Sequence, residues 1–160
     1  MYIRELLVGA MAVCFCTVMA AGNVTKAGEN HDGELIKLSS GYPFALTVQK
    51  LDAALVGKGF TVFATIDQKK AANSAGLDMP PTTLLVYGNP KGGTPLMVAA
   101  PDFALDLPLK VLVREEGDGQ VTVVYQPAAS LDGRHGLPAG LAAKLGAGEA
   151  VIAAAIKAPN

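Results

Sequence analysis

The sequence predicts an α+β domain: a single antiparallel sheet of about five strands, with two main helices on one face and two short helices besides. Two observations support this. Apolar residues recur at helical spacing near the start and the end of the domain, whereas four segments between them alternate or run in β-rich residues. The expected order is strand, helix, four strands, helix, and one face of the sheet can bury both helical stripes.

The first half of the domain begins with a short strand over residues 34–39. The following helix starts near Thr47 and ends at Gly57 and Gly59, where Gly59 is suited to be a left-handed C-cap. Residues 60–66 then alternate between apolar and polar side chains, which is typical of a half-buried strand.

A short helix over residues 67–75, capped by Asp67, precedes the next strand. Pro80 and Pro81 lead into residues 82–87, a continuous β-rich run suited to the centre of a sheet. The sequence leaves the cis or trans state of both proline bonds open.

The second half continues with a short helix that has Thr94 as its N-cap and Pro95 as its first residue, and that stops at Pro101. Residues 109–115 and 120–126 are expected to be strands, because a Glu-Gly-Asp-Gly turn joins them as in a hairpin.

An Ala-rich helix is the last element and is expected over residues 137–157. Gly146 and Gly148 lie inside it and favour a break into two pieces. Its apolar stripe is Leu141, Leu145, Ile152 and Ile156.

The N-terminus has the pattern of an export signal. Residues 6–21 are an uninterrupted run of apolar and small side chains, shorter than the ~20 residues that a membrane helix needs. We expect cleavage after Ala20 or Gly22 and a periplasmic or secreted protein; the alternative is an uncleaved membrane anchor. The predicted organisation is a signal peptide over 1–22, a flexible leader over 23–33 and a single domain over 34–157.

Both cysteines, Cys14 and Cys16, lie inside this apolar run. After cleavage no cysteine is left for a disulfide, a thiolate nucleophile or a Cys-based metal site. The charges are almost balanced, with 13 Lys plus Arg against 14 Asp plus Glu. Without a basic stripe or a tryptophan, nucleic acid is not an expected partner.

The segment LDMPPTTLLVYGNPKGGTPLMVAAPDFALDLPLKVLV over residues 77–113 is the most distinctive part of the chain. Together with LDAALVGKGFTVFATID before it and RHGL after it, it resembles the bacterial and archaeal Domain of Unknown Function family 302, over residues 36–156. The resemblance implies a fold related to that of the TATA-binding protein and no established chemistry. That fold implies no DNA binding here, because the basic surface is missing.

The loop around YGNPKGGT is the first candidate site. Its glycines would let the backbone approach an anion, and a helix beginning at Thr94 would direct free N–H groups at it. The loop residues of this predicted weak anion site are Asn89, Lys91, Gly92, Gly93 and Thr94, with φ > 0 expected at Gly93. The alternative is a plain turn between strand and helix.

His135 is the second candidate, because it is the one histidine of the predicted domain, in the sequence Arg134-His135-Gly136. As a general base it would need a carboxylate, and Asp132 is the nearest in sequence. A hydrolase or transferase using His135 with Asp132 is therefore one hypothesis; a hydrogen-bonded surface residue is the other. The spacing of Asp102, Asp106, Asp132 and His135 does not favour a metal site, and no cofactor is expected.

From these patterns we expect an exported, non-catalytic protein that binds a ligand or associates with itself as a homodimer. A ligand-binding protein or an enzyme would have a concave pocket lined by Lys91, Arg134 and His135, and its ligand would be a small anion. A self-associating protein would have an exposed apolar patch there instead.

Overall fold

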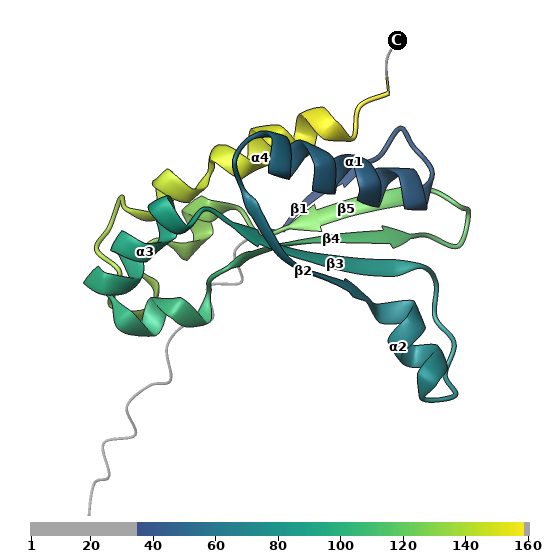
Figure 1. The fold of residues 1–160 in the computed structure, drawn as a ribbon, viewed down its shortest axis with the longest axis horizontal. Coiled ribbons are helices and arrows are strands. Elements are labelled where there is room, and N and C mark those ends of the chain that lie inside the picture. The colour runs from purple at the N-terminus through teal and green to yellow at the C-terminus, as the bar shows by residue number, and fades with distance from the viewer. Residues whose placement is uncertain (1–34, 159–160) are drawn as a thin grey trace, which may run out of the picture. The chain divides into compact units, whose positions relative to one another are not determined.

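The computed structural model describes residues 35–158, which form an antiparallel sheet of five strands in the order β1-β5-β4-β3-β2 (Figure 1). The predicted signal peptide and leader, with Cys14, Cys16 and His31, lie outside the described residues. The strands are β1 (Ile36–Ser39), β2 (Thr61–Asp67), β3 (Thr82–Gly88), β4 (Leu109–Glu115) and β5 (Val121–Tyr125). The predicted α+β fold with a single antiparallel sheet is confirmed.

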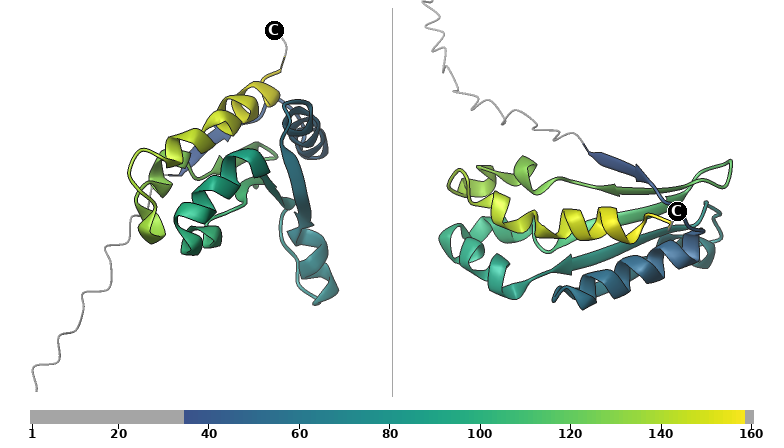
Figure 2. Two further views of the ribbon diagram at one scale, coloured as in Figure 1. Left: turned by 60° about the vertical axis from the view of Figure 1, so that its left-hand side comes forward. Right: turned by 90° about the horizontal axis from the view of Figure 1, so that it is seen from above.

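Two helices, α1 (Phe44–Gly57) and α4 (Ala147–Ala155), run over the same face of the sheet (Figure 2, right). A short helix, α2 (Gln68–Ser74), follows the edge strand β2 and has no buried residue. The helix α3 (Pro90–Ala99) lies at the other end of the sheet (Figure 1). Four short 3-10 turns complete the domain: η1 (Pro101–Leu105), η2 (Ala128–Leu131), η3 (Arg134–Gly136) and η4 (Ala142–Leu145).

The main core lies between the sheet and the pair α1 and α4. Strand register places Leu85 beside Val111 and Val113 beside Val123, so that their side chains form one apolar layer. Leu51 and Leu55 of α1 and Ile152 of α4 close this layer, and all three are fully buried. The helical periodicity of α1 and α4 therefore has the packing role that the sequence predicts.

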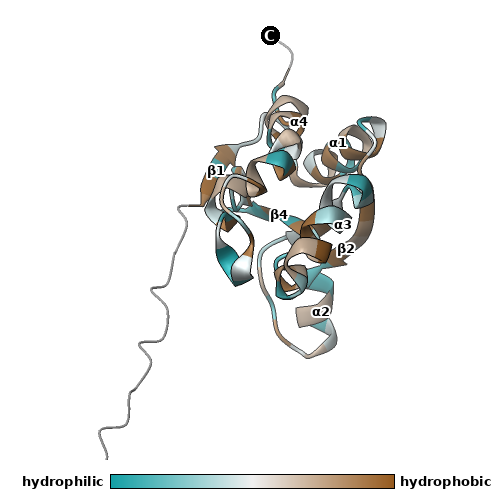
Figure 3. Cartoon of the chain, turned by 90° about the vertical axis from the view of Figure 1, so that its left-hand side faces the viewer, coloured by the Kyte–Doolittle hydropathy of each residue, from teal (hydrophilic) through white to brown (hydrophobic). Residues whose placement is uncertain are grey.

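A second apolar cluster lies at the end of the sheet that carries α3. Its members come from α3 and the 3-10 turns: Leu96, Ala100, Phe103, Ala128, Leu131, Leu137, Ala142 and Leu145. Figure 3 views the domain from this end. Both clusters contact the partly buried Leu109 at the start of β4, so the two are continuous.

The helix predicted over residues 137–157 is wrong in its first half. The α-helix begins only at Ala147, and the preceding residues form η4 and irregular turns. Gly140 has φ +81°, a left-handed conformation that ends any continuous helix. The structure settles the question that the sequence leaves open for Pro80 and Pro81: both peptide bonds are trans, and the cis bond of the described residues is Leu107–Pro108.

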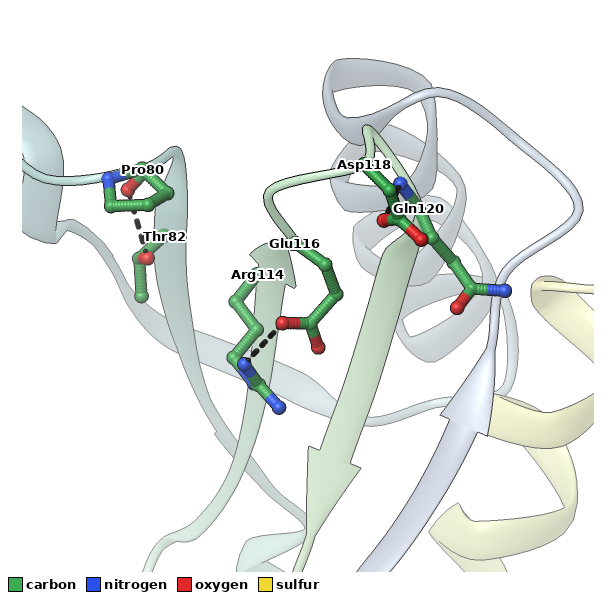
Figure 4. Close-up of polar contacts among 6 residues, drawn as sticks. All are labelled: Pro80, Thr82, Arg114, Glu116, Asp118 and Gln120. Carbon is green, nitrogen blue, oxygen red and sulfur yellow. Dashed lines mark hydrogen bonds and ion pairs between the residues drawn. The ribbon is translucent and has the colours of Figure 1, made fainter.

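The hairpin between β4 and β5 has the short turn that its Glu-Gly-Asp-Gly sequence predicts (Figure 4). Arg114 donates to Glu116 across 2.7 Å, and the Asp118 carboxylate accepts from the Gln120 N–H at 3.0 Å. On the neighbouring strand the Thr82 hydroxyl donates to the Pro80 carbonyl at 3.0 Å. These local bonds fix the tip of the sheet farthest from α3.

Candidate functional site

The loop of the predicted anion site is the first turn of α3. The helix begins at Pro90 rather than Thr94, and Asn89 is its N-cap. Pro95 lies inside the helix, so the prediction of Thr94 as N-cap is wrong. Asn-Pro starts the helix because the asparagine side chain caps it and the proline has no N–H to satisfy.

The N–H groups that would receive an anion already have partners. The Lys91 N–H donates to the Asn89 side-chain oxygen at 3.0 Å, and the Gly92 and Gly93 N–H groups donate to the Asn89 carbonyl at 2.9 Å. Gly93 is helical and is not among the glycines with positive φ, so the expectation of φ > 0 there is also wrong. An anion at this loop could therefore contact the Lys91 side chain, but the N–H groups of Lys91, Gly92 and Gly93 are not free to bind it.

A cavity of about 150 Å³ opens beside this loop. It lies where the start of β2, the end of β3, the first turns of α3, the 107–109 segment and the turn into α4 meet. Its apolar lining consists of Phe60, Phe63, Pro90, Met97, Leu107, Pro108, Leu109, Leu145 and Ala147. The remaining lining residues are Gly88, Asn89, Gly92, Gly93 and Lys144.

Two features of the sequence leave this space unfilled. A β-bulge shifts the register between Val62 and Ala64, so Phe63 is the extra residue of β2 and borders the cavity. Glycines form another part of the wall and leave it without side chains: a Cβ at Gly93 would lie 3.4 Å from Leu107 Cδ1. A Cβ at Gly92 would meet no atom within 4 Å in the described part of the chain.

Lys144 is the one charged side chain among the residues that line the cavity within 35–158, and it is exposed. Asn89 adds a polar group, since its oxygen accepts from Lys91 and its amide NH₂ is a further donor. Lys91, Arg134 and His135, predicted to line one pocket, are not among the residues that line this cavity.

Arg134 and His135 meet a different carboxylate from the one that the sequence suggests. Arg134 Nη2 lies 3.2 Å from Asp106 Oδ1, and His135 Nε2 lies 3.4 Å from Asp106 Oδ2. The Asp106 side chain is 12% exposed. His135 has φ +49°, between Gly133 at +74° and Gly136 at +79°, so the turn is left-handed at three positions. This turn aims both side chains at one carboxylate.

Asp132, predicted as the partner of His135, instead holds the backbone. Its two oxygens accept from the Gly140 N–H at 2.7 Å and the Ala142 N–H at 3.2 Å. Both acceptors are therefore used to order the segment before η4. Sequence reasoning misses Asp106 as the partner because it lies far from His135 along the chain, and no spacing pattern links residues on separate turns.

Two buried tyrosines lie under α4. Burial chiefly, with Glu149 and Tyr125 adding to it, raises the pKa of the Tyr87 phenol far above its ordinary value. Burial, followed by the Glu149 carboxylate, likewise raises the pKa of Tyr125. The Glu149 carboxylate itself accepts from the Ala128 N–H at 2.8 Å. Both phenols are thus neutral at physiological pH and act as packing groups.

Over residues 35–158, no cluster of three or more His, Cys, Asp or Glu side chains is arranged to hold a metal ion. The same part of the chain contains no helix that is both long and apolar enough to cross a membrane.

This architecture is shared with a solved structure, the crystal structure of an uncharacterized conserved DUF302 protein from Bacillus stearothermophilus. The two chains align with a TM-score of 0.65 and 21% identity, over 76% of this chain and 94% of the other. The chain belongs to the family described as domain of unknown function DUF302, which matches residues 36–157. The resemblance found in the sequence is therefore confirmed.

Curated relatives come from Brucella. The chain is 37% identical over 106 residues to "Fluoride-specific ion channel FluC 1" of Brucella suis biovar 1 (strain 1330), and this covers 66% of the chain and 42% of that protein. The same identity holds for "Fluoride-specific ion channel FluC 1" of Brucella abortus biovar 1 (strain 9-941), of which 39% is covered. The chain thus spans only about two fifths of the length of these relatives.

Proposed function

We propose that this chain is an exported, non-catalytic binding protein whose cavity between β2, α3 and α4 receives a small, mostly apolar molecule. The observation that carries the proposal is the cavity itself: aromatic, aliphatic and Met side chains form most of its wall. Concave apolar sites with a few polar groups are the usual form of small-molecule sites. Export rests on the N-terminal pattern of the sequence.

The size of the cavity limits the ligand. At about 150 Å³ it is smaller than the ~300–1,000 Å³ typical of sites for drug-sized molecules. A buried apolar cavity of ~150 Å³ in another protein binds benzene. A ligand with a body of roughly benzene size therefore fits the space.

The fluoride named in the Brucella relatives is a poor fit to this cavity. A small anion is strongly hydrated, and apolar walls cannot replace the hydrogen bonds that it would lose on entry. The amides of α3 that could replace them already donate to Asn89. We therefore propose that contact with the apolar side chains of the wall is the main determinant of binding.

The proposal can be tested by titrating isotope-labelled protein with toluene, benzamide and fluoride and following the backbone amides. Toluene and benzamide are expected to shift the Gly88, Gly92 and Gly93 signals, while Gly117 and Gly119 at the hairpin tip stay in place. Fluoride is expected to shift neither set. Cavity amides that stay unmoved with saturating toluene and benzamide would refute the proposal.

A blocking variant sharpens the test. Gly92→Leu places a side chain where a Cβ meets open space, so it should fill the cavity and remove binding without unfolding the chain. Gly57→Leu is the matched control, because Gly57 is also helical and a Cβ there would likewise meet no atom of the described residues within 4 Å. Binding that survives in Gly92→Leu would place the ligand elsewhere.

A second candidate is a hydrolase or transferase, favoured by the contact between His135 Nε2 and Asp106 Oδ2. Many general bases are imidazoles that a carboxylate holds by a hydrogen bond; here the two groups lie within ion-pair distance, and Asp106 Oδ2 has no hydrogen-bond partner among the described residues. Turnover of nitrophenyl esters or phosphates that disappears in His135→Gln would support it. Self-association as a homodimer, the third possibility, would appear as a dimer mass in native mass spectrometry.

A further inference from the structure

The single cation of the cavity wall specifies the chemical class of the ligand more closely. We propose that the ligand is an amphiphilic monoanion, with an apolar body and one carboxylate that forms an ion pair with Lys144. This inference rests on the proposed function. The cavity wall includes this lysine and, among residues 35–158, no Asp or Glu. The charge that the described residues contribute to the cavity wall is therefore positive.

The structure fixes the backbone that carries Lys144. Its neighbours Ala142 and Leu145 are buried in the second apolar cluster, and the Ala142 N–H donates to Asp132. The side chain of Lys144 is nevertheless exposed at the cavity. An ammonium group held in this way can reach a ligand head group at the opening while the ligand body lies among the apolar side chains.

The carboxylates closest to the cavity in sequence do not compete for Lys144. Asp106 precedes the lining residue Leu107 but contacts Arg134 and His135. Glu149 follows the lining residue Ala147 but accepts from the Ala128 N–H. Within the described residues, no carboxylate lies in ion-pair distance of Lys144.

One lysine suits a monoanion better than a phosphate dianion. An ammonium is a point charge that neutralises one unit of negative charge, and the adjacent α3 amides are already occupied by Asn89. A second negative charge would be left without a partner beside apolar walls, which disfavours its binding. A carboxylate neutralises the charge of Lys144 and can also accept a hydrogen bond from the Asn89 amide NH₂.

Benzoate and benzamide test this inference, because they share size and shape and differ in charge. In the wild-type protein, benzoate is expected to bind about two- to fivefold more tightly than benzamide, the range for a solvent-exposed ion pair. Lys144→Met should reduce this ratio to about one. Lys37→Met, on the strand at the far edge of the sheet, is the matched control and should keep the ratio.

The outcomes separate the two proposals. If both probes shift the cavity amides with equal affinity, or if the preference for benzoate survives in Lys144→Met, the carboxylate inference is wrong and the apolar site stands. If neither probe shifts these amides, the proposed function itself fails. A preference that is lost in Lys144→Met and kept in Lys37→Met supports both.

Discussion

The two apolar clusters of this domain contain similar side chains, but one is built from regular strands and helices and the other largely from turns and 3-10 segments. The main core joins regular elements, in which three strands and two helices present residues at fixed periods. The second cluster joins one helix to turns and 3-10 segments that have no period. The cavity borders both, with Phe60 from the side of the main core and Leu145 from the second cluster.

This difference in packing is related to where the candidate sites lie in the fold. The strands β3, β4 and β5 and the helices α1 and α4 bury their apolar residues closely, since repeated spacing lets side chains interdigitate. Irregular segments pack less uniformly, and here they border both the cavity and the cluster of Asp106, Arg134 and His135. The regular half thus serves as the support on which the irregular half positions its groups.

The largest expected effect tests whether the second cluster is part of the cooperative core. Phe103 is fully buried in that cluster. Phe103→Ala should lower the free energy of unfolding by about 3–5 kcal/mol, through lost burial and the cavity left behind. Thermal and denaturant unfolding measure this, with the nearby exposed Leu105→Ala as a control that should change little.

If the second cluster opens independently, Phe103→Ala will instead leave the main transition unchanged. Hydrogen exchange would then show loss of protection in η1 and η3 with intact protection of β3 and β4. That result would separate the two clusters energetically, although they share contacts with Leu109.

The sequence predicts the main core well and the second cluster poorly, for a physical reason. The spacing of Leu51 and Leu55, and of Ile152 and Ile156, reveals one face of each helix, because a helix repeats its environment every 3.6 residues. The stripe drawn through Leu145 and Ile152 is wrong, since the structure assigns Leu145 to the second cluster and Ile152 to the main core.

The sites are harder to predict than the fold. The sequence correctly predicts that a strand ends just before Asn89 and Lys91, but the capping by Asn89 that occupies the amides depends on where the helix begins. The cavity depends on a bulge at Phe63 and on Lys144 in a turn, and neither has a local sequence pattern. Contacts between separate turns are set by the whole fold.

An intermediate effect is expected at Gly148, where α4 crosses the end of β3. A Cβ at this position would lie 2.8 Å from the Tyr87 ring and 2.9 Å from its hydroxyl oxygen. Because Tyr87 is only 2% exposed, Gly148→Ala should destabilise the fold by about 1–3 kcal/mol, as overpacked cores do. Unfolding by denaturant measures the change.

Gly57→Ala is the control for Gly148→Ala, because it makes the same substitution in α1 without a steric contact within the described residues. It should stabilise the protein by up to about 1 kcal/mol, since alanine is the better helix former. Equal effects at both positions would show that the main core is not closely packed at Tyr87.

The smallest expected effect concerns the left-handed turn at His135, and it isolates backbone strain from side-chain contact. Both His135→Ala and His135→Gly remove the imidazole from Asp106, so the lost contact is the same. Only glycine relieves the φ of +49°, which costs an L-residue about 1–2 kcal/mol. Glycine also gives the unfolded chain more conformational entropy, which folding must remove, and this offsets part of the gain.

The Gly variant should therefore be more stable than the Ala variant by about 1 kcal/mol in denaturant unfolding. If the two are equally stable, the turn relaxes once the imidazole is removed, and the contact with Asp106 holds the backbone rather than the reverse.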